Sequence, residues 1–262
     1  MNHRDTENLT FELLETWSTF NHYAKEAQHF ENPEDVHQAR IRLRKLITFA
    51  RLVDLTEEPV YLIWKRLMHA FGEVRDLDVQ LEATSNKTEM DQLFANHIAL
   101  QLQGKRSTLI ETMHLLISNE LDRSVRRFLA GPMTKQLRRM SEKELIQSAE
   151  KRYEKKREHF EKVQRKDGAK RIERMHELRL ATKAYRYAVE YLRPYTKQPK
   201  SAVDRLKATQ TRLGQINDTY QLLERWRSFE VPTAYQKERL RQIERLEDEL
   251  RTSLDQVEIA HG

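Results

Sequence analysis

An all-helical fold is the class that the sequence predicts, and three features of the 262-residue chain predict it. Apolar residues recur with a helical period along the whole length, which argues against disorder although 34% of the residues are charged. Only six Gly and six Pro are present, so few positions interrupt a long helix. No run of alternating β-branched residues marks a strand.

Four helices are expected in the first half of the chain. Apolar periodicity places them at residues 6–30, 36–53, 60 to about 83 and about 89–118. Asn32-Pro33 is expected to start the second helix, because a capping residue followed by Pro in the first turn is a helix start signal. The break before the third helix is at Pro59, and a turn is expected at residues 85–87.

Gly131-Pro132 is a strong break and is expected to separate the two halves. Further breaks are expected at Lys166-Asp167-Gly168, Pro199 and Val231-Pro232. They leave helices at 133 to about 163, then one ending at Arg193-Pro194, then 201 to about 229 and about 233–257. The chain is thus expected to form one domain over residues 6–258, with halves of about 6–130 and 133–258.

Charge is distributed unevenly along the chain, whose formal net charge is +6. Residues 1–35 contain eight acidic residues against two basic ones, a net charge of −6. Residues 151–186 contain 14 Lys or Arg against six Asp or Glu, a net charge of +8. A local excess larger than the charge of the whole chain indicates an anionic partner.

Several protein classes are disfavoured by what the chain lacks. Cysteine is absent, which excludes disulfides and thiol chemistry. The first 15 residues do not resemble a secretory signal, and no apolar run reaches the roughly 20 residues of a membrane span. We therefore expect a soluble, cytoplasmic protein without membrane contact.

A helix with a row of cations is expected at MHELRLATKAYRYAVE, residues 175–190. The row begins at His176 and continues three, seven and ten residues later with Arg179, Lys183 and Arg186. On a helix these side chains lie within about 80° of the histidine. The apolar residues fall mostly on the opposite side, so one face packs and the other is cationic.

A second row of the same kind follows Asn32-Pro33. His37 is followed three, seven and fourteen residues later by Arg40, Arg44 and Arg51, all within about 60° on a helix, with Lys45 to one side. No acidic residue occurs from Val36 to Val53, whereas bases on a solvated helix usually alternate with acids four residues away. The sequence therefore offers these cations no acidic partner within residues 36–53.

An internal repeat links the two rows. Gly72 follows His37 by 35 residues, and Gly214 follows His176 by 38. Each glycine has a lysine seven residues before it and an aspartate four residues after it: Lys65 and Asp76, Lys207 and Asp218. This recurrence predicts two four-helix units related by an approximate twofold, each with its basic row facing inward. The expected use of Gly72 is close approach between helices.

Binding of a polyanion is the function that these rows favour. Arg offers a planar fork of donors to phosphate oxygens and Lys a point charge, and each row spans about 15–20 Å. The alternative is a solvated basic face, which the missing acids and the duplication disfavour. The histidines either line the site, where protonation strengthens binding at lower pH, or cap and pack beside an acid.

The carboxylates near the rows allow two interpretations. Asp76 and Asp218 are metal ligands or general bases, or they orient Arg and Lys side chains across a helix interface, which we favour. Glu190, four residues after Arg186, is expected to do the same on its own helix. Cations beside both histidines disfavour a metal site, and no paired nucleophile and base, glycine-rich phosphate loop or HExxH motif occurs. We expect no catalytic residue, metal or cofactor.

The two halves resemble those of the CHAD family (conserved histidine α-helical domain), on HQARIRLRKL with FGEVRDLDV and on MHELRLATKAYRYAVE with LGQIND. The resemblance extends from about residue 10 to about 255. It implies two pseudosymmetric four-helix bundles around a central basic pore, which together form one CHAD domain. It also implies non-catalytic binding of inorganic polyphosphate and association with polyphosphate granules.

The family motifs imply a set of binding residues, to which the repeat adds Lys65 and Lys207. The implied residues are His37, Arg40, Arg44, Lys45, Arg75, His176, Arg179, Lys183 and Arg186. The second half departs from the first, because Asn217 stands where Arg75 does and Ala184 where Lys45 does. A nucleic-acid-binding protein is the alternative, against which stand the lack of a helix-turn-helix and of aromatic platforms. An enzyme acting on phosphate anhydrides would need acidic metal ligands among the cations.

Overall fold

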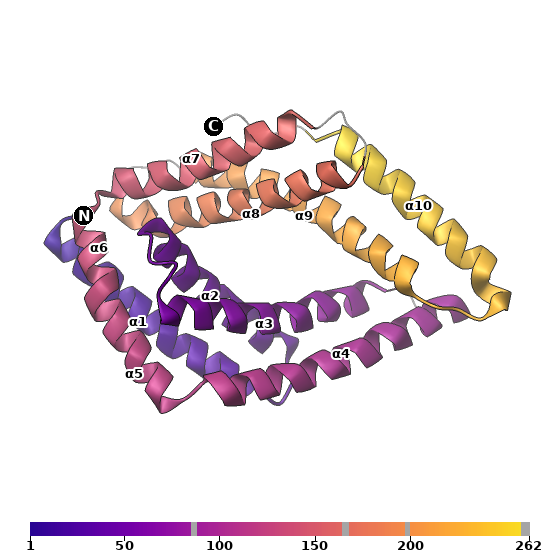
Figure 1. Cartoon of the computed structure of the whole chain (residues 1–262), viewed down its shortest axis with the longest axis horizontal. Helices are drawn as coiled ribbons and strands as arrows, with labels where there is room; N and C mark the ends of the chain where they lie inside the picture. Colours follow the sequence, from indigo (N-terminus) through magenta and orange to yellow (C-terminus); the bar gives the residue numbers. More distant parts are fainter. Residues whose placement is uncertain (85–87, 164–167, 197–199, 258–262) are drawn as a thin grey trace. The chain divides into compact units, whose positions relative to one another are not determined.

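Helices make up most of the chain in the computed structural model, which describes residues 1–84, 88–163, 168–196 and 200–257 (Figure 1). No strand occurs within these ranges, so the expected all-helical class is confirmed. The turn expected at 85–87 and the breaks expected at Lys166-Asp167 and Pro199 lie outside the described residues. The chain divides into two compact units, Met1–Leu145 and Ile146–Gly262, and each is described by itself.

Unit 1 begins with five helices in succession. They are α1 (His3–Glu26), α2 (Pro33–Leu52), α3 (Pro59–Ala83), α4 (Glu89–Leu116) and α5 (Asn119–Phe128). In this unit α1 packs on α2, α2 on α3 and α3 on α4. The start signal at Asn32-Pro33 acts as expected: Asn32 caps α2 by accepting a hydrogen bond from the backbone N–H of Glu34, at 3.0 Å.

An aromatic cluster forms part of the core of unit 1 and joins three of its helices, α1, α3 and α5. Trp17 of α1 lies beside Trp64 of α3, with ring centroids 6.4 Å apart, and Trp64 meets Phe128 of α5 edge-on at 5.6 Å. The indole N–H of Trp17 donates to Asp122 of α5 at 2.8 Å. Burial of these large rings fixes which face of each helix points inward.

The break expected at Gly131-Pro132 is wrong. Leu129–Met133 form a π-helix that connects α5 directly to α6 (Thr134–Arg139). The wider π turn accommodates Pro132, which has no N–H to donate, and the Thr134 hydroxyl donates to the Leu129 carbonyl at 2.8 Å. The chain therefore stays helical through the position at which we expected it to end.

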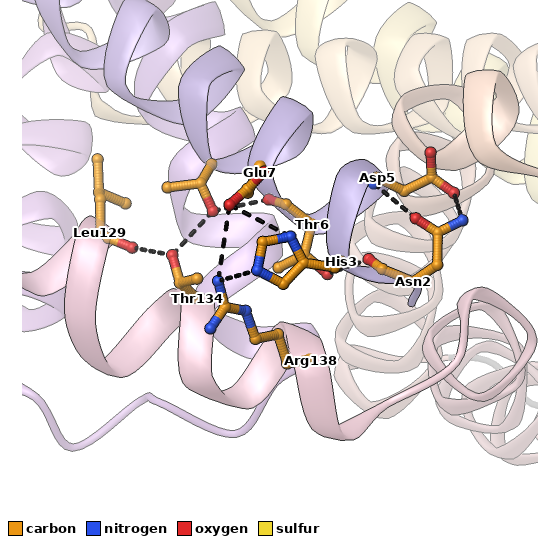
Figure 2. Close-up of polar contacts among 9 residues, drawn as sticks. Asn2, His3, Asp5, Thr6, Glu7, Leu129, Thr134 and Arg138 are labelled. Atoms are coloured by element: carbon orange, nitrogen blue, oxygen red, sulfur yellow. Dashed lines mark hydrogen bonds and ion pairs between the residues drawn. The ribbon is translucent and has the colours of Figure 1, made fainter.

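Figure 2 shows how α6 is tied to the first turns of α1. The hydroxyl groups of Thr10 and Thr134 lie 2.8 Å apart, and the Thr10 hydroxyl lies 2.8 Å from the carbonyl oxygen of Thr6. Nearby, a guanidinium nitrogen of Arg138 lies 3.4 Å from Nε2 of His3. These contacts join the two ends of unit 1.

The single helix expected over residues 133–163 is also wrong, because it divides at Met140. Met140 has an extended backbone, and α7 (Glu142–Glu161) starts after it. Ser141 and Glu144 form a reciprocal cap: the Ser141 N–H donates to the Glu144 carboxylate at 2.7 Å, and the Glu144 N–H donates to the Ser141 hydroxyl at 3.2 Å. The compact units divide after Leu145, later than the expected seam. The pseudosymmetric relation of the halves stays a prediction.

Among its described residues, unit 2 contains the remainder of α7 and three further α-helices: α8 (Ala169–Leu192), α9 (Lys200–Ser228) and α10 (Gln236–Asp255). α8 packs on α9, and α10 runs back along α9 (Figure 1). The buried Arg171 of α8 donates to Asp255 of α10 at 2.8 Å. This ion pair joins the first turn of α8 to the last turn of α10.

Gly72 does not mark a tight helix crossing, contrary to expectation, and neither does Gly214. A Cβ atom at Gly72 would lie 3.7 Å from a guanidinium nitrogen of Arg40, which is an ordinary contact. A Cβ atom at Gly214 would have no such neighbour within 4 Å. Gly72 thus faces the side chain of Arg40 rather than the backbone of another helix.

We predict that Gly214→Ala stabilises the protein by about 1 kcal/mol, because alanine costs less conformational entropy in a helix and the site has room. Thermal unfolding followed by circular dichroism measures the change. Gly168→Ala is the contrasting variant and should lower the midpoint, since Gly168 has a φ of 111°. A lower midpoint for Gly214→Ala would contradict the prediction.

Candidate functional site

The cations of α2 are positioned by burial of the opposite face of the helix. Ala39, Leu43 and Leu46 are fully buried, and the side chains that face away from them are half-buried: His37, Arg40 and Arg44. The amphipathic pattern therefore has the consequence expected from the sequence. Packing of the apolar face against α1 and α3 leaves the cations together on one side.

α3 adds a third arginine and the expected carboxylate to this side of unit 1. Arg40 donates to Asp76 at 3.3 Å, although Asp76 is largely exposed. Arg75 lies 3.8 Å from the carboxylate of Glu82, on its own helix. Asp76 therefore contacts Arg40, a member of the first row of cations, as an orienting carboxylate would. Since this pair is exposed to solvent on one side, its energetic contribution is small.

Like charges crowd together in what we call the unit 1 cluster, defined as His37, Arg40, Arg44 and Arg75. Burial lowers the pKa of His37, and the three arginines lower it further against the opposing pull of Glu34. Burial also lowers the pKa of Arg40, and Arg44 and Arg75 add to this against the attraction of Asp76. Positive potential from two helices, α2 and α3, thus converges on one place.

Lys45 and Lys65, the two lysines expected in the first site, have different neighbours. Burial and the charge of Arg51 lower the pKa of Lys65, so α2 and α3 bring these two cations near each other. Arg51 also donates to the Tyr61 hydroxyl at 2.9 Å. Lys45 instead bonds Glu12 of α1 at 3.1 Å. Arg51 is absent from the expected set of binding residues, although its spacing already placed it on the stripe.

In unit 2 the stripe lies on α8, whose buried face includes Met175 and Leu178. His176 is exposed, and the other members are half-buried: Arg179, Lys183 and Arg186. Arg179, Lys183 and Arg186 therefore keep part of each side chain accessible, as a binding surface requires. We call these four side chains the unit 2 row.

Arg186 is held by contacts on three sides. Its Nε donates to Gln210 of α9 and its Nη1 to Glu190, both at 2.7 Å, and its guanidinium lies 4.1 Å from the centre of the Tyr187 ring. Glu190 thus contacts the arginine it was expected to orient. Gln210 carried no signal in the sequence, because nothing in α9 indicates which residue faces Arg186.

His176 contacts the residue that replaces Arg75 in the second half. Its Nδ1 lies 3.2 Å from the side-chain oxygen of Asn217, which is buried. The Asn217 amide nitrogen donates to Asp218 at 3.4 Å. The contact of Asp218 is thus with an amide, rather than with the Arg or Lys side chain that we expected it to orient.

Lys207 borders an open hollow of about 660 Å³ on α9, together with Asp204 and Arg212. Arg212 also donates to the backbone carbonyl of Gln256, just beyond α10. The hollow has a mixed lining of one acid and two cations, which differs from the crowded cations of the unit 1 cluster. Lys207 is therefore placed beside Arg212, a cation that the repeat did not indicate.

Two further searches of the described residues bear on the kind of site. They contain no group of three or more His, Asp or Glu side chains placed to hold a metal ion. None of the described helices is both long and apolar enough to cross a membrane.

Comparison with known proteins identifies a family and a fold. The family model of the CHAD domain matches residues 13–227. The CHAD domain from the plant Ricinus communis is 20% identical, with a TM-score of 0.69 over 97% of this chain and 92% of that one. PptA from Streptomyces chartreusis is 13% identical, with a TM-score of 0.66 over 95% of each chain. At these identities the structures show a shared fold. No curated protein matches.

We predict that His37 titrates below the ordinary histidine pKa of about 6.5, because burial and three arginines disfavour its charged form. Arg75→Gln should raise the pKa of His37. Histidine proton shifts in NMR, assigned with His37→Gln, measure both values. Arg66→Gln, a change at an exposed residue of α3, the helix that also contains Arg75, is the control. It should leave the pKa of His37 unchanged.

The same shift sets the sign of a pH effect on folding. The unfolded chain takes up the proton first, so His37 lowers stability as pH falls from about 6.5 to the lower folded-state pKa. His37→Gln should remove this loss. A His37 signal that titrates above 6.5 in the wild type would contradict the electrostatic description of the unit 1 cluster.

Proposed function

Because this chain belongs to the CHAD domain family, we propose that it binds inorganic polyphosphate without catalysing a reaction on it. The ligand is a linear polyanion, and the binding residues are the unit 1 cluster and the unit 2 row, with Lys65 nearby. This function combines the family membership with the charge and geometry of the two stripes.

The crowding of like charges in the unit 1 cluster is the observation that carries the proposal. Three arginines repel one another and His37, while burial removes water that would screen them. An anion placed among them relieves this repulsion and accepts their hydrogen bonds. Cations on a solvated surface spread apart, whereas packing of α2 on α3 keeps these together.

The length of the stripe favours a chain of phosphates over a single one. From His37 to Arg51, α2 advances about 21 Å at 1.5 Å per residue. In unit 2 the row from His176 to Arg186 advances about 15 Å. Successive cations one or two turns apart can each meet a different phosphate of an extended polyanion, whereas orthophosphate reaches one or two of them.

Arg186 supports the same proposal from unit 2. Its Nε and Nη1 are occupied by Gln210 and Glu190, so the guanidinium has lost much of its rotational freedom before any ligand arrives. Such preorganisation lowers the entropic cost of binding. A pore shared by both stripes, cytoplasmic location and association with polyphosphate granules stay predictions from the sequence.

We predict that long-chain polyphosphate binds far more tightly than orthophosphate and is recovered at its original length after incubation with Mg²⁺. Affinity should fall steeply with salt, because each neutralised phosphate releases a counterion. Isothermal titration calorimetry at several salt concentrations measures both effects. Equal affinity for the two ligands, or phosphate release, would contradict the proposal.

We predict that Arg40→Glu and Arg179→Glu each weaken polyphosphate binding by roughly tenfold to a hundredfold, the effect of losing a charged hydrogen bond. Each reversal should also make the salt dependence less steep by about one released ion. Calorimetry measures affinity, and circular dichroism checks folding.

The matched control reverses two exposed cations of α10, Lys237→Glu and Arg251→Glu, which lie outside both stripes. This control changes the net charge by the same amount as the Arg40→Glu/Arg179→Glu double variant. Its affinity for polyphosphate should stay near that of the wild type. Unchanged affinity in a folded Arg40→Glu/Arg179→Glu double variant would overturn the proposed site. Competition by RNA at similar concentrations would favour a nucleic-acid-binding protein instead.

A further inference from the structure

The contact between His176 and Asn217 determines where the histidine carries its proton. Nδ1 of His176 lies 3.2 Å from Oδ1 of Asn217, across the packed pair α8 and α9. Asn217 is 7% exposed, so water gives its side chain little alternative. His176 itself is exposed and can meet a ligand.

The orientation of the Asn217 amide follows from its second contact. Its nitrogen Nδ2 donates to the carboxylate of Asp218 at 3.4 Å, so the oxygen Oδ1 is the atom that faces His176. A carboxylate only accepts hydrogen bonds, and so does the oxygen of an amide. The Nδ1 atom of His176 must therefore be the donor and carry a hydrogen.

This arrangement limits what a neutral His176 can offer to a phosphate. With the hydrogen on Nδ1, the other ring nitrogen, Nε2, has a lone pair and repels an anionic oxygen. After uptake of one proton, both nitrogens carry hydrogen, and Nε2 donates a charge-assisted hydrogen bond. No covalent bond is formed or broken other than that N–H bond.

We propose that Asn217, oriented by Asp218, is a positioning residue that directs the His176 proton to Nδ1, so that His176 engages a phosphate oxygen only as the imidazolium. The inference rests on the proposed function, because the phosphate belongs to the bound polyanion. It gives Asp218 a role different from the one that its place in the repeat suggested.

The first half lacks this device. Arg75 occupies the position that corresponds to Asn217, three residues after the repeated glycine. A guanidinium has only donors, so it cannot accept a hydrogen bond from His37. Proton uptake linked to binding through an oriented amide is thus assigned to the second half alone.

Charged groups on three helices are linked to His176 by helical spacing or through a shared neighbour, and they enter the experiment. On α8, Glu173 and Arg179 lie within one turn of His176 on the same side. α9 contributes Asp218 through Asn217. α7 contributes Lys156, which bonds Glu177, the residue after His176, at 2.9 Å. With acids and bases on both sides, His176 has neighbours of both signs, and the hydrogen bond to Asn217 is its directional contact.

The free protein provides the first test, by ¹⁵N NMR of the His176 ring at about pH 8, where histidine is neutral. His176→Gln assigns the signals. The wild type should show hydrogen on Nδ1, and Asn217→Asp, which retains an acceptor, should do the same. Asn217→Leu should shift the hydrogen toward Nε2. Asp218→Ala, a change at an exposed residue, frees the Asn217 amide to rotate and should shift the ring hydrogen partly toward Nε2. This variant replaces Asn217→Leu if the latter does not fold.

Polyphosphate provides the second test, by calorimetry at about pH 7.5 in buffers of different ionisation enthalpy. Wild type should take up as much as about one proton more than His176→Gln on binding. Asn217→Leu should reduce this difference, because neutral His176 can then donate from Nε2.

The outcomes separate this inference from the proposed function. Hydrogen on Nε2 in the wild type, or equal proton uptake by wild type and His176→Gln, overturns the inference while polyphosphate binding stands. Absence of polyphosphate binding overturns the proposed function and the phosphate step together. The nitrogen shifts still decide whether Asn217 directs the proton, because they need no ligand.

Discussion

Repulsion among cations that packing forces together is the interaction on which the rest of this protein depends. The apolar face of α2 is buried against α1 and α3, which keeps Arg40 and Arg44 on one side of the helix and within reach of the charge of Arg75. The aromatic cluster around Trp17 holds together α1 and α3, the two helices on which α2 packs. Stability of the core is thus converted into a local excess of positive charge that an anion can relieve.

The two halves use this principle differently. In the first, Arg75 joins the unit 1 cluster and disfavours protonation of His37. In the second, Asn217 replaces that charge with an oriented hydrogen-bond acceptor for His176. At equivalent positions of the repeat, Arg75 therefore acts on its histidine through charge, whereas Asn217 acts on its histidine through a directed hydrogen bond. Arg186, held by Gln210 and Glu190, adds rigidity to the second half.

The errors in the predicted helices have local causes that the sequence pattern does not reveal. Gly131-Pro132 was expected to end a helix, but a π turn accommodates it and the Thr134 hydroxyl satisfies a carbonyl there. Met140 was expected inside a helix, but the reciprocal cap of Ser141 and Glu144 starts a new one. Both signals were present as residue types. Thr134 also contacts Thr10 of α1, a partner that is distant in sequence.

The sequence by itself determined the all-helical class, the two rows of cations and the repeat that relates them, because helical periodicity and residue spacing are properties of one chain segment. Tertiary structure alone decided which groups meet across helices: Asp76 with Arg40, Gln210 with Arg186 and Asn217 with His176. Register between two helices sets these contacts. Register is fixed by how buried side chains interlock, and no single segment encodes that.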